Sequence, residues 1–443
     1  MTSAAFDGRR LHFLGIGGAG MSGLALVARR LGAEVTGSDR AADSPWLARL
    51  HDAGVKTRMG HDEPPPAGVE LVVSSAIAED NPELAVARAA GATVLHRGDL
   101  LGEVTALKRT IAVAGTHGKT TTAAMAALVL IEAGADPAFL IGGDLRAVKA
   151  NAAWGAGEWA VVEADESDRS FLKLDREVAV VTNAELDHHA TYRSLADLEG
   201  AFAEFVAPAP VAVLGPGVEL AHPQTRRFGI GQGDLAAEDV RLSPAGSRFT
   251  VDGAEIALSV PGEHNVLNAL AALAACQEAG VPPERAAAGL ARFTGAGRRF
   301  EEHGSTASGA RVVDDYAHHP TEVRATLAAA RTLEPRRVVA VFQPHLFSRT
   351  KLLARDFGRA LAAADVVVVL DVYPARERAE DFPEVSGLLV AEAAADAASG
   401  RPVWWLPRAA DAERMLGQEL AEGDLLLTLG AGDVDAVARS LVA

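Results

Sequence analysis

The chain has 443 residues, too many for one hydrophobic core, and the usual size of a domain predicts two or three of them. Its composition, 49% hydrophobic and 23% charged, is that of a packed globular protein and excludes collagen-like and disordered classes. The formal net charge of -17 opposes general binding to a phosphate backbone, so we expect no nucleic-acid partner. A bound anion must be attracted by a local feature, such as backbone N–H groups at the start of a helix.

The single cysteine, Cys276, can form neither an internal disulfide nor a thiolate zinc site, and this predicts a buried, unreactive thiol in a reducing compartment. The N-terminal stretch MTSAAFDGRRLHFLGIGG lacks a basic segment followed by a long apolar one. No apolar run approaches the roughly 18 residues that cross a bilayer. We therefore expect a cytoplasmic protein with no membrane partner, either a monomer or a homodimer.

Short apolar runs alternate with helical patterns almost throughout, which predicts the α/β class with parallel sheets. In the first third, helices are expected to start near Gly20, Pro45 and Pro82, and strands are expected at 11–14, 35–37, 71–74 and 93–95. In the middle third, a helix ending at Gly134 and a helix over 266–279 accompany strands at 110–115, 159–163, 178–182 and 211–214, with antiparallel hairpins between about 226 and 260. The last third predicts strands at 312–314, 338–342, 366–370, 403–406 and 425–429.

The stretch LGIGGAGMSG, residues 14–23, fits the pattern G-x-G-x-x-G between a strand and a helix. Asp39 follows at about the spacing where a dinucleotide-binding fold places its ribose-binding acid. NAD is one interpretation of this loop. The motif by itself indicates only that backbone N–H groups can approach a pyrophosphate, which UDP-sugars also carry, and a merely tight turn is the structural alternative.

A second loop, AGTHGKTTT at residues 114–122, again lies between a strand and a helix and carries the Lys-Thr pair of an ATP loop. The ammonium of Lys119 can neutralise β- and γ-phosphate oxygens, and the hydroxyl of Thr120 can bind Mg²⁺. The loop is shorter than G-x-x-x-x-G-K-[ST], because Val113 stands where the first glycine would be. Two nucleotide loops favour ATP with a nucleotide-linked second substrate over a dehydrogenase, which needs only the first.

Oxygen ligands for Mg²⁺ are expected after the next two strands. The stretch AVVEADESD ends a strand with Glu163 and continues with further acids at 165, 166 and 168. The stretch TNAELDHHATY brings Asn183, Glu185, Asp187 and His188 together after the following strand. From chemistry alone His188 ranks below Glu163 as a magnesium ligand, and a solvated acidic turn or a hydrogen-bonded loop histidine remains the alternative.

In chain order these stretches resemble the Mur ligases, the ATP-dependent amide-forming enzymes of peptidoglycan precursor synthesis. The resemblance covers nearly the whole chain and rests on GIGGAGMSG, GSD, GTHGKTTT, EADESD, TNAELDHH, GEHNVLNALAA, GRRFE, DDYAHHPTEV, FQPH and GAGD. It implies three domains: a Rossmann-like UDP-sugar-binding domain (1–106), a central P-loop ATPase-type α/β domain with a small antiparallel insert (107–294), and a Rossmann-like amino-acid-binding domain (295–443). We expect hinges near 106 and 295 about which the domains close.

The resemblance also implies the site residues. The expected ATP-binding residues are Gly115, Thr116, His117, Gly118, Lys119, Thr120, Thr121, Asn265, Asn268, Arg298, Arg299 and Asp315. The expected Mg²⁺ ligands are Thr120, Glu163 and His188. The expected substrate-binding residues are Gly15, Gly17, Gly18, Ala19, Gly20, Met21, Ser22, Ser38, Asp39, Ser75, Tyr316, His318 and Arg349. The expected catalytic residues are Lys119, Glu163, His188, His318 and Arg349, with His318 a candidate base.

The sequence departs from the family pattern at two places. Leu346 stands in FQPHLFSRT where many members have arginine, so Arg349 is expected to supply the guanidinium there alone. Residues 189–205 contain no lysine, whereas several sister ligases carry a carbamylated lysine after DHH, and this absence resembles the alanine-adding branch. The expected substrates are UDP-N-acetylmuramate and L-alanine, joined through an acyl phosphate. The alternatives are a ligase that attaches a whole tripeptide to the same sugar nucleotide, an NAD-dependent oxidoreductase, and a catalytically silent nucleotide-binding subunit.

Overall fold

A computed structural model describes residues 5–40 and 44–442 of the chain. These residues form two compact units. The first unit lies within residues 1–184, 195–236 and 268–292, and the second within 185–194, 237–267 and 293–443. Both units contain sheets packed against helices, so the predicted α/β class is confirmed.

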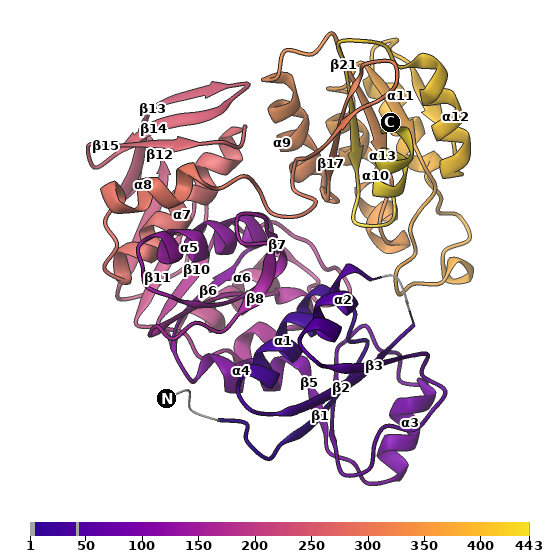
Figure 1. Cartoon of the computed structure of the whole chain (residues 1–443). Helices are drawn as coiled ribbons and strands as arrows, with labels where there is room; N and C mark the ends of the chain where they lie inside the picture. Colours follow the sequence, from indigo (N-terminus) through magenta and orange to yellow (C-terminus); the bar gives the residue numbers. More distant parts are fainter. Residues whose placement is uncertain (1–4, 41–43, 443) are drawn as a thin grey trace. The chain divides into compact units, whose positions relative to one another are not determined.

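The first sheet of the first unit has the strand order β3-β2-β1-β4-β5, and every pair in it is parallel (Figure 1). Its strands are β1 (Arg10–Leu14), β2 (Glu34–Asp39), β3 (Lys56–Met59), β4 (Glu70–Val73) and β5 (Val94–His96). Its helices are α1 (Ala19–Arg30), α2 (Pro45–Asp52), α3 (Pro82–Ala89) and α4 (Arg97–Thr105). The strand order reverses at β1, and such a reversal places a crevice at the carboxyl end of that strand, where the first glycine loop begins.

The second sheet of this unit runs β12-β11-β10-β6-β9-β7-β8, with β6 at the point where the order reverses. Its strands are β6 (Arg109–Ala114), β7 (Ala138–Leu145), β8 (Ala150–Ala153), β9 (Trp159–Glu163), β10 (Val178–Val181), β11 (Val211–Leu214) and β12 (Thr225–Ile230). The helices are α5 (Lys119–Glu132), α6 (Leu195–Val206) and α8 (Pro283–Ala291), with 3-10 turns η1 (Glu166–Asp168) and η2 (Ser170–Lys173). Strand β10 is buried throughout and α5 is buried from Thr120 to Leu130, which explains their continuous apolar sequences.

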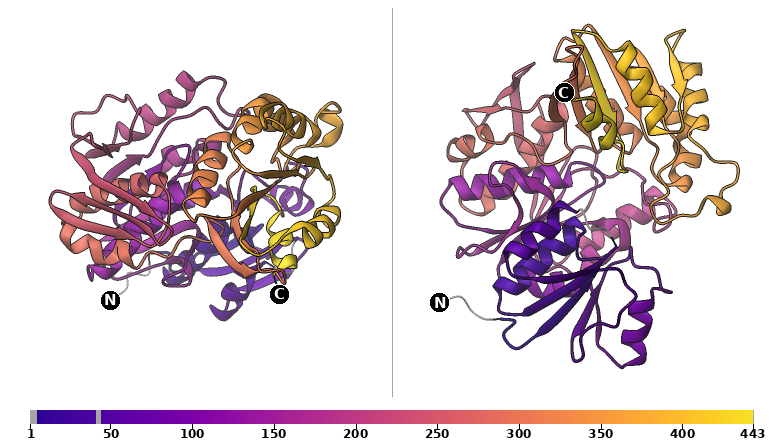
Figure 2. Two further views of the ribbon diagram at one scale, coloured as in Figure 1. Left: turned by 90° about the horizontal axis from the view of Figure 1, so that it is seen from above. Right: turned by 45° about the vertical axis from the view of Figure 1, so that its right-hand side comes forward.

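The second unit contains a sheet of order β16-β17-β21-β18-β19-β20, parallel except for the antiparallel edge strand β16 (Figure 2, orange to yellow). The strands are β16 (Glu301–Ser305), β17 (Arg311–Asp315), β18 (Arg337–Phe342), β19 (Val366–Val369), β20 (Val403–Trp405) and β21 (Asp424–Leu429). The helices are α9 (Pro320–Arg331), α10 (Phe347–Leu361), α11 (Leu388–Ala397), α12 (Ala409–Glu419) and α13 (Asp435–Leu441), with the 3-10 turn η3 (Ala379–Asp381). Two separate apolar clusters, one including α9, α10 and α11 and the other α12 and α13, cover the two faces of this sheet.

The predicted antiparallel insert is present as β13 (Leu235–Ser243), β14 (Gly246–Val251) and β15 (Ala254–Leu258), before α7 (Glu263–Glu278). At the start of the predicted region, β12 pairs in parallel with β11. The predicted domain boundaries and hinges stay predictions. Among the described residues, no helix combines the length and apolarity that a bilayer crossing requires.

Candidate active site

The ATP-type loop joins β6 to α5, and its glycines meet a steric requirement. Gly115 has φ +124° and Gly118 has φ +80°, a backbone region that favours glycine. A Cβ atom on Gly115 would stand 2.1 Å from Thr182 Oγ1, and one on Gly118 would stand 2.2 Å from Asn268 Oδ1. The loop can therefore hold this conformation only with glycine at both positions.

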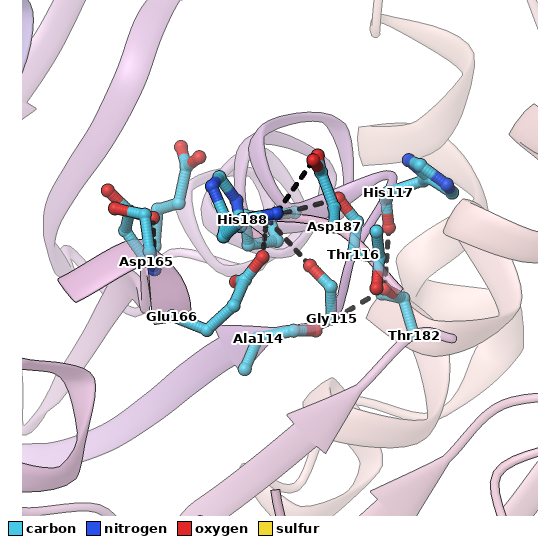
Figure 3. Close-up of polar contacts among 12 residues, drawn as sticks. Ala114, Gly115, Thr116, His117, Asp165, Glu166, Thr182, Asp187 and His188 are labelled. Carbon is cyan, nitrogen blue, oxygen red and sulfur yellow. Dashed lines mark hydrogen bonds and ion pairs between the residues drawn. The ribbon is translucent and has the colours of Figure 1, made fainter. Parts of the chain in front are cut away.

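The end of β10 fastens the same loop, as Figure 3 shows for Thr182 and His117. Thr182 Oγ1 donates to the His117 carbonyl at 2.6 Å, and Asn183 Nδ2 donates to it at 3.0 Å. The His117 and Thr116 N–H groups donate to the side chain and carbonyl of Asn183 at 2.9 and 3.2 Å. Sequence reasoning did not single out Thr182, although its place between a buried strand and a cluster of polar residues was the available signal.

Lys119 lies at the start of α5, and its ammonium donates to three oxygens. These are the carbonyls of Gly115 and Thr116 at 2.7 and 3.2 Å and Glu166 Oε1 at 3.0 Å, and Figure 3 shows these oxygens converging. Burial opposes the charge on Lys119, but Glu166, Asp165 and Glu163 outweigh it and raise the pKa of the lysine. The side chain is therefore a fixed cation, 13% exposed, within the loop.

Two of the predicted metal ligands, Thr120 and Glu163, meet in the first unit. Thr120 Oγ1 donates to Glu163 Oε1 at 2.9 Å, and the Gly142 N–H donates to Glu163 Oε2 at 2.7 Å. A hydroxyl and a carboxylate held side by side at a strand end are suitable oxygen donors for Mg²⁺. His188 belongs to the second unit, where it has a positive φ of +52° and its N–H donates to Asp187 Oδ1 at 2.7 Å. Its role as a metal ligand stays a prediction.

The first glycine loop is held by the end of β2. The Gly15 and Ile16 N–H groups donate to the Ser38 carbonyl at 2.8 and 3.0 Å, and the Gly17 N–H donates to Asp39 Oδ2 at 2.7 Å. Gly18 caps α1, within which the predicted residues Gly20, Met21 and Ser22 lie, the last two of them buried. The N–H groups of Gly15, Ile16 and Gly17 therefore donate within the unit, and contact of the rest of the loop with a pyrophosphate stays a prediction.

The Ser38 side chain lies among buried polar groups, and its expected contact with substrate stays a prediction. It is fully buried, and its hydroxyl donates to Glu83 Oε2 at 2.6 Å. His12 and His61 also contact Glu83, at 2.8 and 3.2 Å. Burial alone would raise the pKa of Glu83, but hydrogen bonds from His12, Ser38 and His61 lower it to about 2. The Ser38 hydroxyl therefore belongs to a buried polar cluster beneath the loop.

In the second unit, the two arginines of GRRF contact different partners. Arg298 donates to Asp314 Oδ2 at 3.0 Å and to the carbonyls of Gly432 and Gly430 at 2.8 and 2.9 Å. These bonds tie Arg298 to its own sheet, whereas Arg299 is 3.5 Å from Glu322 Oε1. The resemblance left the phosphate clamp open between Arg298 and Arg299, and this role stays a prediction.

The other side chains that are predicted to contact the nucleotide also form hydrogen bonds within their own units. Asp315 accepts from the N–H groups of Phe300 and Ala317 at 2.7 and 2.8 Å, and burial raises its pKa to about 6. Asn265 Nδ2 donates to the Pro261 carbonyl at 2.7 Å in the second unit. Asn268 belongs to the first unit, where its Oδ1 accepts from Thr122 Oγ1 at 3.4 Å beside Gly118. Asn268 thus reaches the ATP-type loop itself.

Of the predicted substrate-side residues, Arg349 and His318 interact with Asp187 in the second unit, and Tyr316 packs against His318. Arg349 donates to both oxygens of Asp187 at 3.0 and 3.1 Å, and His345 Nδ1 is 3.2 Å from Arg349 Nη1. His318 Nδ1 is 3.0 Å from the Tyr316 carbonyl, and the two rings meet edge to face at 5.4 Å. Burial lowers the pKa of His318 to about 4, so its imidazole is neutral at pH 7.

Leu346, the departure from the family pattern, lies next to this group with φ +70°. It is 8% exposed and caps the start of α10. Such a conformation is uncommon for a branched residue and costs on the order of 1–3 kcal/mol. Arg349 Nη1 lies 3.2 Å from His345 Nδ1, and its expected role as the guanidinium of this place stays a prediction.

Family models match three successive parts of the chain. They describe a Mur ligase family catalytic domain (residues 10–109), a Mur ligase middle domain (113–276) and a Mur ligase glutamate ligase domain (298–432). The UDP-N-acetylmuramate--L-alanine ligase of Kineococcus radiotolerans is 50% identical, with 98% of this chain and 97% of that protein covered.

Solved structures agree with the sequence relatives. The crystal structure of the UDP-N-acetylmuramate-alanine ligase MurC of Thermotoga maritima matches with a TM-score of 0.83 at 30% identity, covering 98% of both chains. The murein peptide ligase of Psychrobacter arcticus matches with a TM-score of 0.73 at 26% identity and the same coverage. The order of the loops, the three sheets and these full-length matches together show that the chain belongs to the Mur ligase family.

Proposed function

We propose that the protein catalyses the ATP-dependent ligation of L-alanine to the lactyl carboxylate of UDP-N-acetylmuramate, a step of peptidoglycan precursor synthesis. The observation that carries the proposal is the full-length 50% identity to a ligase of that name. The ATP-type loop, with Lys119 held by Glu166 and Thr120 by Glu163, supports it from the chemistry of the site. ATP and UDP-N-acetylmuramate suit a cytoplasmic enzyme.

The reaction needs ATP because a carboxylate does not condense with an amine in water. A lactyl carboxylate oxygen attacks the γ-phosphorus of ATP, the bond from that phosphorus to the bridging oxygen breaks, and ADP leaves. The alanine amine, after losing a proton, attacks the acyl carbon of the acyl phosphate, and inorganic phosphate departs with the former carboxylate oxygen. Lys119 offsets negative charge among the phosphate oxygens during the first step.

We propose that Mg²⁺ binds together with ATP. The hydroxyl of Thr120 and the carboxylate of Glu163 fit the ion by donor type, and we propose His188 as the third ligand. When bound, the ion supplies neutralisation of phosphate charge. Thr116, His117 and Thr121, with the two loop glycines, are proposed to surround the phosphates. Asn265, Asn268, Arg298 or Arg299, and Asp315 are proposed to bind the rest of ATP.

His318 has the geometry of a hydrogen-bond acceptor through Nε2. Its Nδ1 lies 3.0 Å from a carbonyl oxygen, which fixes the neutral tautomer with the proton on Nδ1 and leaves the lone pair on Nε2. A pKa of about 4 makes this nitrogen a weak base. We therefore propose that His318 orients the amine and passes its proton onward, with Tyr316 and Arg349 lining the same place.

The ligase that attaches a whole tripeptide is the second candidate, because a murein peptide ligase is also a structural relative. Its lower TM-score and identity, 0.73 and 26%, favour the alanine-adding reaction. An NAD-dependent oxidoreductase would have no use for Lys119 and Thr120 in the ATP-type loop.

A phosphate-release assay over a panel of amino acids and the tripeptide, with and without UDP-N-acetylmuramate, tests the proposal. Release should require both the sugar nucleotide and L-alanine. Release that requires the tripeptide instead, or that requires no acceptor, would contradict it. Small-angle scattering should show compaction when both nucleotides bind, as closure about hinges near 106 and 295 predicts.

A further inference from the structure

Arg97, the first residue of α4, has a guanidinium fixed at one end by two carboxylates. Its Nη2 is 3.0 Å from Asp165 Oδ2 and 3.5 Å from Asp168 Oδ2. Both acids belong to the EADESD stretch that follows β9, the strand that ends in Glu163. Burial opposes the charge, but Asp165 and Asp168 outweigh it and raise the pKa of Arg97.

The two carboxylates are themselves oriented. Asp165 caps η1 by accepting from the Ser167 N–H at 3.0 Å, and Asp168 accepts from the Ser170 N–H at 3.0 Å. Asp168 Oδ2 also accepts from Ser75 Oγ at 3.0 Å. Each acid is thus held by its own turn, and together they fix the direction in which the Arg97 guanidinium points.

The other end of this guanidinium faces the first glycine loop. A Cβ atom on Gly20 would stand 3.5 Å from Arg97 Nη1, so this nitrogen lies directly beside the loop. Within residues 5–40 and 44–442, Nη2 is the only Arg97 side-chain nitrogen with a hydrogen bond to another side chain. The side chain is 23% exposed. Arg97 therefore has donors available on the side that faces Gly20.

We propose that Arg97 binds an anionic oxygen of UDP-N-acetylmuramate at the first glycine loop. The inference rests on the proposed function and names a binding residue for its sugar nucleotide. The shared chemistry is a guanidinium with an oxyanion, which either the diphosphate or the lactyl carboxylate can supply. Asp165 and Asp168 act as positioning residues, because they hold the guanidinium in the orientation that binding needs.

Arg97 also separates these acids from the loop. Without it, the negative charge of Asp165 and Asp168 would be less compensated toward an incoming anion, so the loss of a charge-assisted hydrogen bond would be accompanied by repulsion. We expect replacement of Arg97 by a neutral residue to weaken binding by about 10- to 100-fold, the effect of losing one such hydrogen bond.

The test is calorimetric titration of the full chain as wild type, Arg97→Gln and Arg97→Lys. Arg88→Gln is the matched control, because Arg88 is an exposed arginine of the neighbouring helix α3 that pairs with exposed Glu79. The ligands are UDP-N-acetylmuramate, UDP-N-acetylglucosamine and ATP. The second sugar nucleotide keeps the diphosphate and lacks the lactyl carboxylate, so it distinguishes the two sources of the anion.

Arg97→Gln should weaken UDP-N-acetylmuramate binding by the factor above, Arg97→Lys should recover part of it, and Arg88→Gln should bind as the wild type does. An equal loss for UDP-N-acetylglucosamine identifies the diphosphate, and an unchanged affinity for it identifies the carboxylate. In steady state, KM for the sugar nucleotide should rise while kcat is retained. Unchanged affinity in Arg97→Gln, or an equal loss for ATP, would overturn the inference. Failure of the wild type itself to bind UDP-N-acetylmuramate would instead refute the proposed function.

Discussion

Asp187 and Arg349 form a buried, two-pronged ion pair in the second unit. Both carboxylate oxygens accept from the guanidinium, and the side chains are only 3% and 4% exposed. Burial alone would raise the pKa of Asp187, but Arg349, with smaller contributions from His188 and His318, holds it well below its usual range. The pair therefore fixes the stretch after β10 to the helix that carries Arg349.

Replacing Arg349 by alanine should lower the free energy of unfolding by about 3–5 kcal/mol, because it leaves the Asp187 carboxylate buried without its counter-charge. Urea denaturation of the purified variant measures this. The exposed pair of Arg359 and Asp356 is the control, and Arg359→Ala should cost less than about 1 kcal/mol. Equal costs for the two variants would contradict the role assigned to burial.

Lys119→Ala should reduce alanine-dependent phosphate release by at least about 100-fold, because one preorganised cation at the developing phosphate charge is lost. The exposed Lys173→Ala, which loses only an ion pair with Asp99, is the control and should keep its activity. Circular dichroism should show both variants folded. Turnover in Lys119→Ala at the wild-type rate would refute the assignment of the ATP-type loop.

The sequence predicted the buried parallel strands and both glycine loops well, because continuous apolar runs and glycine spacing are local signals. It did not predict β3, KTRM, or β16, EEHGS, because edge strands carry polar residues that do not alternate as a half-buried strand would. The glycine-containing β7 and its partner β8 were missed for a similar reason.

The sequence could not predict which residues pair with one another in the tertiary structure. Asp187 was noted among the polar residues after β10, but its partner Arg349 is 162 positions away, and no local pattern connects them. The resemblance placed Ser38 among the substrate-binding residues, and no local pattern showed that its hydroxyl donates to Glu83, a partner supplied by a helix 45 positions later. Arg97 was not singled out at all, because its meaning depends on Gly20 and Asp165, which only the fold brings to it.

Gly118→Ala should weaken ATP binding in addition to lowering the free energy of unfolding. The variant must relieve a contact of 2.2 Å between the new Cβ and Asn268 Oδ1 and also hold alanine at a positive φ. Gly134→Ala is matched for backbone strain, with φ +74°, but its Cβ would meet nothing within 4 Å. Both should lose about 1 kcal/mol of stability from strain, and only Gly118→Ala should lose ATP affinity. Equal affinities by calorimetry would contradict the steric argument.

The Cys276 thiol should be unreactive in the folded chain, as the sequence predicted for a buried cysteine. It is fully buried, its Sγ lies 3.6 Å from the Ala126 carbonyl, and burial raises its pKa. Since the thiolate is the reactive form, a thiol-labelling reagent should react only after urea unfolds the chain. Rapid labelling without denaturant would show that the α5–α7 region opens readily.

Stability should fall as the pH is lowered from 7 to 5, because three histidines of the second unit resist protonation. Burial lowers the pKa of His264 and His318 to about 4 and that of His345 to about 3. Between these values and 6.5 the unfolded chain binds protons that the folded chain does not, so this stability is present above pH 6.5 and is lost below it. Asp315, with its pKa raised to about 6, acts in the opposite direction and offsets one histidine.

These four groups alone give a net difference of two protons, which corresponds to a slope of up to about 2.7 kcal/mol per pH unit. Urea denaturation at pH 7, 6 and 5 measures it. His345→Gln removes one of the three groups and should reduce the slope by about 1.4 kcal/mol per pH unit, provided the variant is compared with its own stability at pH 7. A flat profile in the wild type would mean that these rings are solvated well enough to take up protons in the folded state. The neutral state of His318 and His345 would then no longer explain how both rings can lie close to the buried Arg349 guanidinium.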